Sequence, residues 1–119
     1  MFEIKPRGKM YKFEAVLLIN PDISKQILKK EIENFKKQIS LNKGEIISTE
    51  NWGLRDLSYK ISDFKKAFYN FFQLEIEGNK IQIIKKYLTQ NDHILRHLFI
   101  KVNTHNQLPT KLNNEEKQI

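Results

Sequence analysis

The first strand that the sequence predicts, over residues 12–20, is apolar on both faces. One set of alternating positions is entirely apolar: Phe13, Ala15, Leu17 and Ile19. Val16 and Leu18 make most of the intervening set apolar as well. Because successive side chains of a strand point to opposite faces, such a strand belongs in the middle of a sheet. Pro21 ends the strand, since proline cannot donate to a sheet ladder.

Two segments have the spacing of amphipathic helices. In the first, the apolar positions are Leu28, Ile32, Phe35 and Ile39. We expect Ser24 or Asp22 to cap this helix, which runs to about Leu41. In the second, the apolar positions are Ile81, Ile84 and Leu88. Asn79 and Gln82 resemble a capping box at its start, and it ends near Gln90.

Three more segments, 45–61, 67–77 and 93–102, have the residue types and alternation of strands. Gly53 interrupts the first of them, which predicts a bulge or a close backbone approach. The element order predicts an α+β fold, a ferredoxin-like β-α-β-β-α-β sandwich. Its four-stranded antiparallel sheet carries two helices on one face. This domain spans 11–102, between an N-terminal extension (1–10) and a flexible C-terminal tail (103–119).

The alternation in the last two strands predicts which side chains lie on the face of the sheet that the helices leave open. These are aromatic and basic: Tyr69, Phe71, His97, Phe99 and Lys101. Aromatic rings on an open sheet stack unpaired bases in several RNA-binding modules. They also anchor protein interfaces. The alternation leaves RNA, a partner protein and the N-terminal arm as alternative occupants of this face.

The same topology is found in the RNA recognition motif, which needs characteristic aromatic residues in its first and third strands. The first strand here ends in Val16-Leu17-Leu18-Ile19-Asn20, without an aromatic residue. The third begins Lys66-Ala67-Phe68-Tyr69-Asn70-Phe71, which matches the motif at only a few positions. The similarity to that domain is therefore one of topology alone.

Composition favours a nucleic-acid partner and disfavours catalysis. The chain has 119 residues, a formal net charge of +7 and a pI of about 9.6. Lysine and arginine neutralise phosphates and release counterions, although a small domain also uses net charge for solubility alone. There is no cysteine, which excludes disulfides, thiolate zinc sites and thiol nucleophiles. No apolar run approaches the roughly 20 residues that span a bilayer.

Catalytic and metal-binding patterns are missing from the sequence. Glu75 and Glu77 share one strand face, but no pocket-forming loops surround them. His93, His97 and His105 lack the spacing of a helical metal pair. The few glycines are isolated, so no phosphate-binding loop is present. We predict a protein that is not an enzyme and uses no cofactor or metal.

Residues 50–61 carry a family signature. They read Glu-Asn-Trp-Gly-Leu-Arg-Asp-Leu-Ser-Tyr-Lys-Ile. This closely resembles the motif Gly-x-Arg-x-Leu-Ala/Ser-Tyr-x-Ile of the sixth small-subunit ribosomal protein of bacteria and organelles. Segments 11–16, 20–22 and 91–101 are similar to the opening strand, first turn and last strand of that family. The resemblance extends over about residues 10–102.

The resemblance implies a structural constituent of the small ribosomal subunit, in the bacterial cytoplasm or the mitochondrial matrix. It implies binding to the central domain of small-subunit rRNA together with the eighteenth small-subunit protein, S18. With the predicted open face it gives these candidates for RNA contact: Lys12, Arg55, Lys60, Arg96, His97 and Lys101. The candidates for contact with the partner protein are aromatic: Trp52, Tyr59, Tyr69, Phe71 and Phe99.

The sequence departs from the family pattern at two places. Ala67-Phe68 stands where relatives usually have glycine and an aromatic residue, and Leu95-Arg96 where many have two arginines. An alternative function comes from the fold, because ferredoxin-like domains host many activities. In that alternative the chain is a regulatory or ligand-binding module that assembles through its open sheet face. Co-sedimentation with small ribosomal subunits distinguishes the two.

Overall fold

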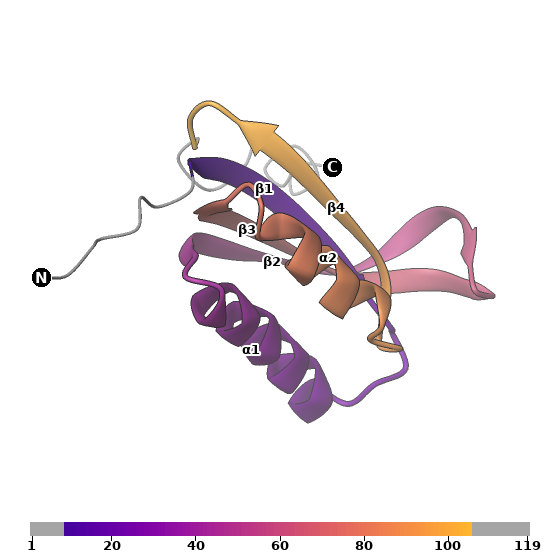
Figure 1. Ribbon diagram of the computed structural model, residues 1–119. Coiled ribbons are helices and arrows are strands. Elements are labelled where there is room, and N and C mark those ends of the chain that lie inside the picture. Colours follow the sequence, from indigo (N-terminus) through magenta and orange to yellow (C-terminus); the bar gives the residue numbers. More distant parts are fainter. Residues whose placement is uncertain (1–8, 106–119) are drawn as a thin grey trace, which may run out of the picture.

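The computed structural model describes residues 9–105; the remainder of the predicted extension and tail lies outside the described residues. Strands and helices follow the predicted order (Figure 1). They are β1 (Met10–Ile19), α1 (Lys25–Leu41), β2 (Glu45–Ile61), β3 (Phe64–Glu77), α2 (Ile81–Thr89) and β4 (Ile94–Val102).

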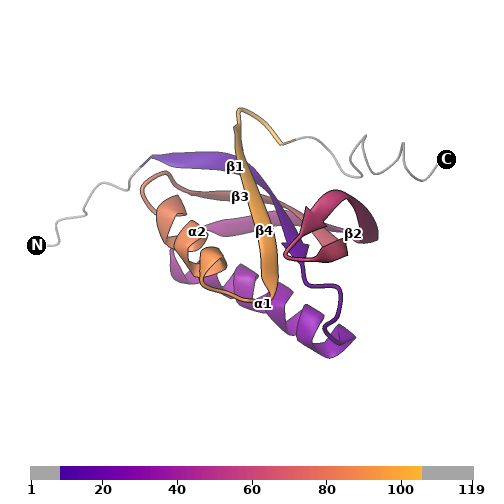
Figure 2. The ribbon, with the colours of Figure 1, turned by 90° about the vertical axis from the view of Figure 1, so that its right-hand side faces the viewer.

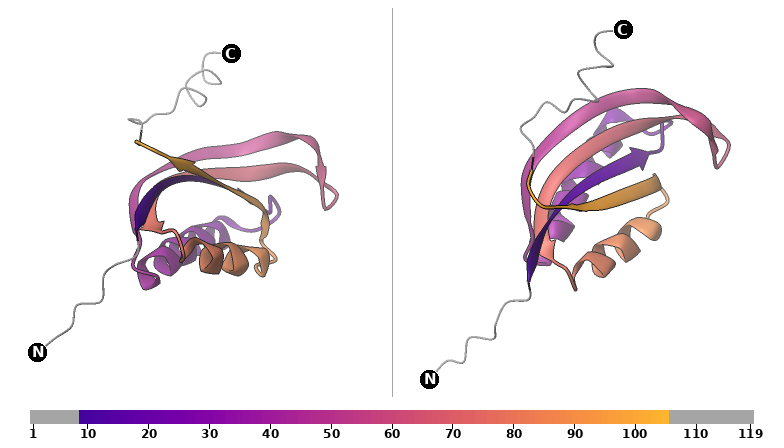
Figure 3. Two further views of the ribbon diagram at one scale, coloured as in Figure 1. Left: turned by 45° about the horizontal axis from the view of Figure 1, so that its top comes forward. Right: turned by 90° about the horizontal axis from the view of Figure 1, so that it is seen from above.

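The four strands form one antiparallel sheet in the order β2-β3-β1-β4. Both helices lie against the same face of this sheet, and the other face is uncovered by any described element (Figures 1 and 3). The predicted β-α-β-β-α-β sandwich is therefore confirmed. β1 is an inner strand, as its two apolar faces indicated, while β2 and β4 are the sheet edges.

The hydrophobic core lies between the sheet and the helices. Its strand residues come from alternate positions of β1 and β3, because the register pairs Ala15 with Phe72 and Phe13 with Leu74. From the helices come Phe35, Ile39, Ile84 and Leu88, each at most 1% exposed. The rings of Phe35 and Phe72 are 4.7 Å apart. Burial of such side chains contributes about 1.5–3 kcal/mol each.

The caps of the two helices differ. Ser24 caps α1, since its side chain accepts a hydrogen bond from the amide of Ile27 at 3.2 Å. The capping box predicted for α2 is wrong: Lys80 is the N-cap residue and makes no side-chain cap bond. α2 therefore depends on its apolar stripe, of which three residues are buried.

The connection between β2 and β3 is shorter than predicted. β3 begins at Phe64 rather than at residue 67, and Ser62 and Asp63 alone form the turn. Both turn residues have positive φ, 48° and 69°, as a two-residue hairpin turn requires. The resulting long hairpin extends past the helices (Figures 1 and 3) and curls at its tip (Figure 2).

Gly53 occupies a bulge in β2, as its position in the sequence predicted. The pairing with β3 shifts between Asn51 and Gly53, and Gly53 has φ of 77°. The side-chain oxygen of Asn51 accepts a hydrogen bond from the backbone N–H of Gly53 at 2.8 Å. Because of the extra residue, Trp52 and Arg55 both lie on the open face, with Leu54 on the helix face.

The prediction for β4 was wrong about which set of alternating residues faces the open side. β4 pairs with β1 so that Leu17 lies opposite His97, Ala15 opposite Phe99, and Phe13 opposite Lys101. The β1 residues of these pairs face the helices, so His97, Phe99 and Lys101 do too. Alternation along a strand defines two sets of side chains, whereas only the register with a neighbouring strand tells which set is covered.

Candidate interface on the open sheet face

An apolar patch occupies the centre of the open face. We define the open-face patch by six residues: Val16, Leu18, Tyr69, Phe71, Leu98 and Ile100. Leu98 and Ile100 on the edge strand β4 are 55% and 51% exposed. Large apolar side chains gathered on one exposed surface are typical of interaction sites. Glu14 and Arg96 line the same hollow and give it polar margins.

Trp52 closes one side of the patch by stacking on Phe71. The two ring centroids are 5.2 Å apart and the ring planes differ by 7°. The indole nitrogen donates to a carboxylate oxygen of Glu50 at 2.6 Å. The arrangement fixes a flat aromatic surface beside β3, because the bulge at Gly53 turns Trp52 toward the open face.

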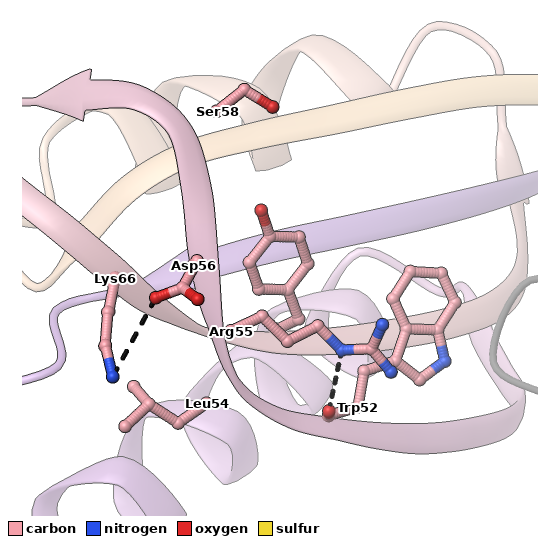
Figure 4. A pocket seen from close by; sticks show the side chains of 7 residues that line it. Trp52, Leu54, Arg55, Asp56, Ser58 and Lys66 are labelled. Carbon is pink, nitrogen blue, oxygen red and sulfur yellow. Dashed lines mark hydrogen bonds and ion pairs between the residues drawn. The ribbon is translucent and has the colours of Figure 1, made fainter. Parts of the chain in front are cut away.

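Arg55 is held on that aromatic surface. Its guanidinium carbon is 5.5 Å from the Trp52 ring centroid, and its Nε donates to the Trp52 carbonyl at 2.9 Å. Figure 4 shows the guanidinium beside the indole, with Leu54 on the other side of the strand. Cation–π contacts of this kind contribute about 0.5–2 kcal/mol. The contact leaves a positive charge positioned at the root of the hairpin.

The curled hairpin brings predicted site residues from distant parts of the chain together. Tyr59 and Leu57 of the hairpin line one hollow with Tyr69 of β3 and Arg96 of β4. Tyr59 is 68% exposed, and Lys60 beside it is exposed. Lys66 and Asp56, which are paired across the hairpin, form an exposed ion pair at 3.8 Å. Such a pair is worth little by itself.

Phe99 lies on the helix side of β4, away from this interface, whereas His97 pairs with the helix-facing Leu17 and also lines the hollow of the open-face patch. The Phe99 ring is 6.4 Å from that of Phe35 and packs against the core. Lys85 on α2 lies 5.9 Å from the Phe99 ring centroid. Burial, and secondarily the charge of Lys85, lowers the pKa of His97 below its ordinary value of 6.5. Phe99 therefore packs against the core rather than on the open face, and the contact of His97 with RNA stays a prediction.

Lys101 and Lys12 lie on opposite faces of the sheet, at the end where β1 begins and β4 ends. The ammonium of Lys101 is 3.8 Å from the Tyr11 ring centroid, and that of Lys9 is 5.3 Å from it. Lys12 belongs to the open-face set, because its register partners are Val102 and Glu75. Of the predicted RNA-contact residues, Arg55, Arg96 and Lys12 therefore share the open face, and Lys60 lies on the hairpin.

Four members of the patch were not predicted from the sequence: Val16, Leu18, Leu98 and Ile100. A signal was present, because β1 is apolar on both faces. An inner strand apolar on both faces needs a second apolar layer, either within the domain or from a partner. The hydrophobic set of β4 was instead assigned to the core.

The described residues contain no group of three or more histidine, aspartate or glutamate side chains able to hold a metal ion. Glu75 of β3 is paired with Lys12 of β1 and with Glu45 of β2. It therefore lies on the surface of the sheet and not in a cleft. None of the described helices is long and apolar enough to cross a membrane. The fold and the surface define a ferredoxin-like binding protein with an apolar open face bordered by arginine.

Comparison with known proteins identifies the family. The family model for ribosomal protein S6 matches residues 12–101. The small ribosomal subunit protein bS6 of Rickettsia felis is 36% identical over 100 residues, covering 84% of this chain and 83% of its own length. That of Brucella canis is 33% identical over 95 residues, covering 80% of this chain and 64% of its own length.

A solved structure supports the fold. The crystal structure of ribosomal protein S6 from Thermotoga maritima superimposes with a TM-score of 0.76 at 22% identity, covering 92% of this chain and 97% of that one. The chain belongs to the ribosomal protein S6 family. It is accordingly a structural component of the ribosome, a protein of the small subunit, and not an enzyme.

Proposed function

We propose that this protein binds the central domain of small-subunit rRNA jointly with the eighteenth small-subunit protein, S18. The open-face patch is the surface for the partner protein. The arginines at its border and the basic hairpin are the surface for rRNA. The observation that carries this proposal is the exposed apolar patch, which lies directly beside Arg55 and Arg96.

The protein side of the proposal follows from burial. Leu98 and Ile100 expose more than half of their surface to water, which is unfavourable by about 25 cal/mol per Å² of apolar area. A partner that covers them gains this free energy. Phe71 and Trp52 supply a rigid aromatic surface beside them, and such residues are enriched at the centres of interfaces.

The RNA side follows from charge and position. Arg55, Lys60 and Arg96 lie on or around the hairpin and the hollow beneath it. Each phosphate contact makes the affinity fall more steeply as salt is added. On duplex nucleic acid the plot of log binding constant against log salt concentration changes slope by about −0.9 per contact. Few such contacts give modest affinity alone. Simultaneous binding of the partner protein then supplies the remaining free energy.

The proposed surface for the partner protein is tested by replacing the apolar side chain of Leu98 with a charged one. Leu98→Glu places a charge in the patch, and we expect partner affinity to fall by at least about tenfold, since a buried unpaired charge is costly. Ile83→Glu is the matched control, because Ile83 is 48% exposed on α2, outside the patch. Titration calorimetry measures both. Equal loss in the two variants would remove the patch from the proposal.

The joint binding of rRNA is tested by filter binding of a central-domain rRNA fragment with and without the partner. We expect much tighter binding when the partner is present, and a shallower salt dependence for Arg96→Ala by about one phosphate contact. Lys37→Ala is the control, since Lys37 is exposed on α1. Equal affinity with and without the partner would contradict joint binding. An unchanged salt slope would remove Arg96 from the RNA surface.

A further inference from the structure

A second groove lies on the helix side of the sheet, outside the open-face patch. It runs between the N-terminal half of α1 and the edge strand β2. Its floor is apolar and consists of Leu28, Ile32 and Phe68. Phe68 is on the helix face, because its register partner in β1 is the buried Ile19. We name it the α1–β2 groove.

The helix wall of this groove is basic. Lys25, Lys29 and Lys36 line it, against one acidic residue, Glu33. None of the three lysines makes an ion pair or side-chain hydrogen bond with another described residue. The wall therefore presents positive charge to solvent around an apolar floor.

Lys25 does not stabilise α1 itself. The first turn of the helix has no acidic residue, and a positive charge near a helix N-terminus opposes the helix dipole by about 0.3–1 kcal/mol. Lys25 and Lys29 are also like charges four positions apart, a spacing that destabilises an isolated helix by about 0.2–0.5 kcal/mol. Carboxylates placed in the groove would relieve both effects.

The opposite wall is the backbone of β2 at its bulge. A Cβ atom built on Gly53 would meet nothing within 4 Å, so the strand is open to an incoming chain at this point. Register shifts at Ile46/Ser48 and Asn51/Gly53 interrupt the edge of β2. Bulges of this kind obstruct the addition of a further strand, so an occupant of the groove is held by its side chains.

We infer that the α1–β2 groove is a docking site for an acidic segment of a partner protein. An apolar side chain of that segment enters the floor between Leu28, Ile32 and Phe68, and its carboxylates meet Lys25, Lys29 and Lys36. The positive charge of the lysines favours an acidic occupant. The apolar floor favours a protein over a nucleic acid, because a phosphate backbone would leave that floor uncovered. The groove opens on the side away from the open-face patch, so both sites can be occupied at once.

The test uses the full chain and a short synthetic peptide of aspartate and glutamate that contains a pair of leucines. Fluorescence anisotropy measures its affinity, and NMR locates it. We expect amide shifts at Gly53 and Phe68 and none at Leu98. Affinity should fall at least about tenfold in Lys29→Glu and change little in Lys30→Glu. Lys30 is the next residue of α1, is also exposed and lies outside the groove.

Two altered peptides separate the contributions of charge and apolar contact. Replacing the leucines by serine, or the carboxylates by amides, should each weaken binding. Absence of peptide binding, equal loss in Lys29→Glu and Lys30→Glu, or shifts confined to the open face would overturn the inference. Polyuridylate that produced larger shifts at Leu28 and Ile32 than the peptide would also overturn it, and would identify the groove as a nucleic-acid site. None of these outcomes depends on rRNA or S18 binding at the open face.

Discussion

The indole of Trp52 lies parallel to the ring of Phe71, with ring centroids 5.2 Å apart. Trp52 belongs to the edge strand β2 and Phe71 to the inner strand β3. The stack depends on the bulge at Gly53, which turns the indole toward the open face and brings Arg55 to the same side. A local feature of the backbone thus positions both the aromatic and the charged members of the proposed interface.

We expect Trp52→Ala to lower the free energy of unfolding by about 1–3 kcal/mol, because the stack and the contact with Arg55 are lost together. Trp52→Phe retains a stacking ring and should cost less. Chemical denaturation measures both. A loss as large in the phenylalanine variant as in the alanine variant would show that stacking is not the stabilising contact.

Trp52 is the one tryptophan of the chain, so its emission reports on the open face. Covering the patch with the partner protein should move the emission to shorter wavelength, because water is displaced from the indole. The partner must lack tryptophan, or carry phenylalanine in its place, for this measurement. Leu98→Glu should prevent the change at the same concentrations.

His97 makes stability depend on pH. Its pKa in the folded protein is lowered below the ordinary 6.5, by burial and then by Lys85. The unfolded chain therefore binds a proton more readily as the pH falls through about 6.5, and folding stability declines until the pH is below the folded pKa. His97→Gln should remove this part of the pH dependence. Thermal unfolding between about pH 5 and 8, the range in which histidine side chains usually titrate, measures the difference between the two proteins.

His93 is the matched comparison for that measurement. Its Nδ1 lies 3.1 Å from a carboxylate oxygen of Glu31. His93→Gln also removes one histidine, so it tests whether the effect belongs to His97 in particular. A flattening as large as in His97→Gln would assign the effect to a different group.

Asn70 is a buried polar residue on the core face of β3, 4% exposed, and its amide nitrogen has no hydrogen-bond partner among the described residues. An unsatisfied buried donor costs about 1–3 kcal/mol. We expect Asn70→Leu, which has a similar shape, to raise the free energy of unfolding. Chemical denaturation measures it, with Gln73→Leu as control, because Gln73 accepts a hydrogen bond from Ser48 and its replacement should destabilise. A decrease for Asn70→Leu would show that the amide is satisfied, for example by water.

Ser62 and Asp63 form the hairpin turn with positive φ at both positions. Side chains other than glycine and asparagine are disfavoured there. Asp63→Gly should therefore stabilise the protein by about 0.5–1 kcal/mol. Asp63→Ala, which keeps the strain and removes the same carboxylate, is the control. Equal effects of the two variants would attribute the change to charge.

The sequence by itself determined the order of the elements, the inner position of β1 and the membership of the family, and it predicted a bulge at Gly53 as one of two alternatives. Each of these depends on local patterns: the periods of helix and strand, the conformational freedom of glycine, and a contiguous signature over 50–61. The prediction of Tyr69 and Phe71 on an open face rested on alternation along the strand, and the register of β3 agrees with it.

Only the tertiary structure decided which side of β4 is covered. His97 and Leu98 belong to opposite faces of β4, and the more apolar set, which contains Leu98 and Ile100, is the one on the open face. Hydrophobicity alone therefore points to the wrong side of this strand. The pairing of Ala15 with Phe99 resolves it, since that contact joins residues far apart in the chain. A strand's alternation is local, whereas its register is a property of the assembled sheet.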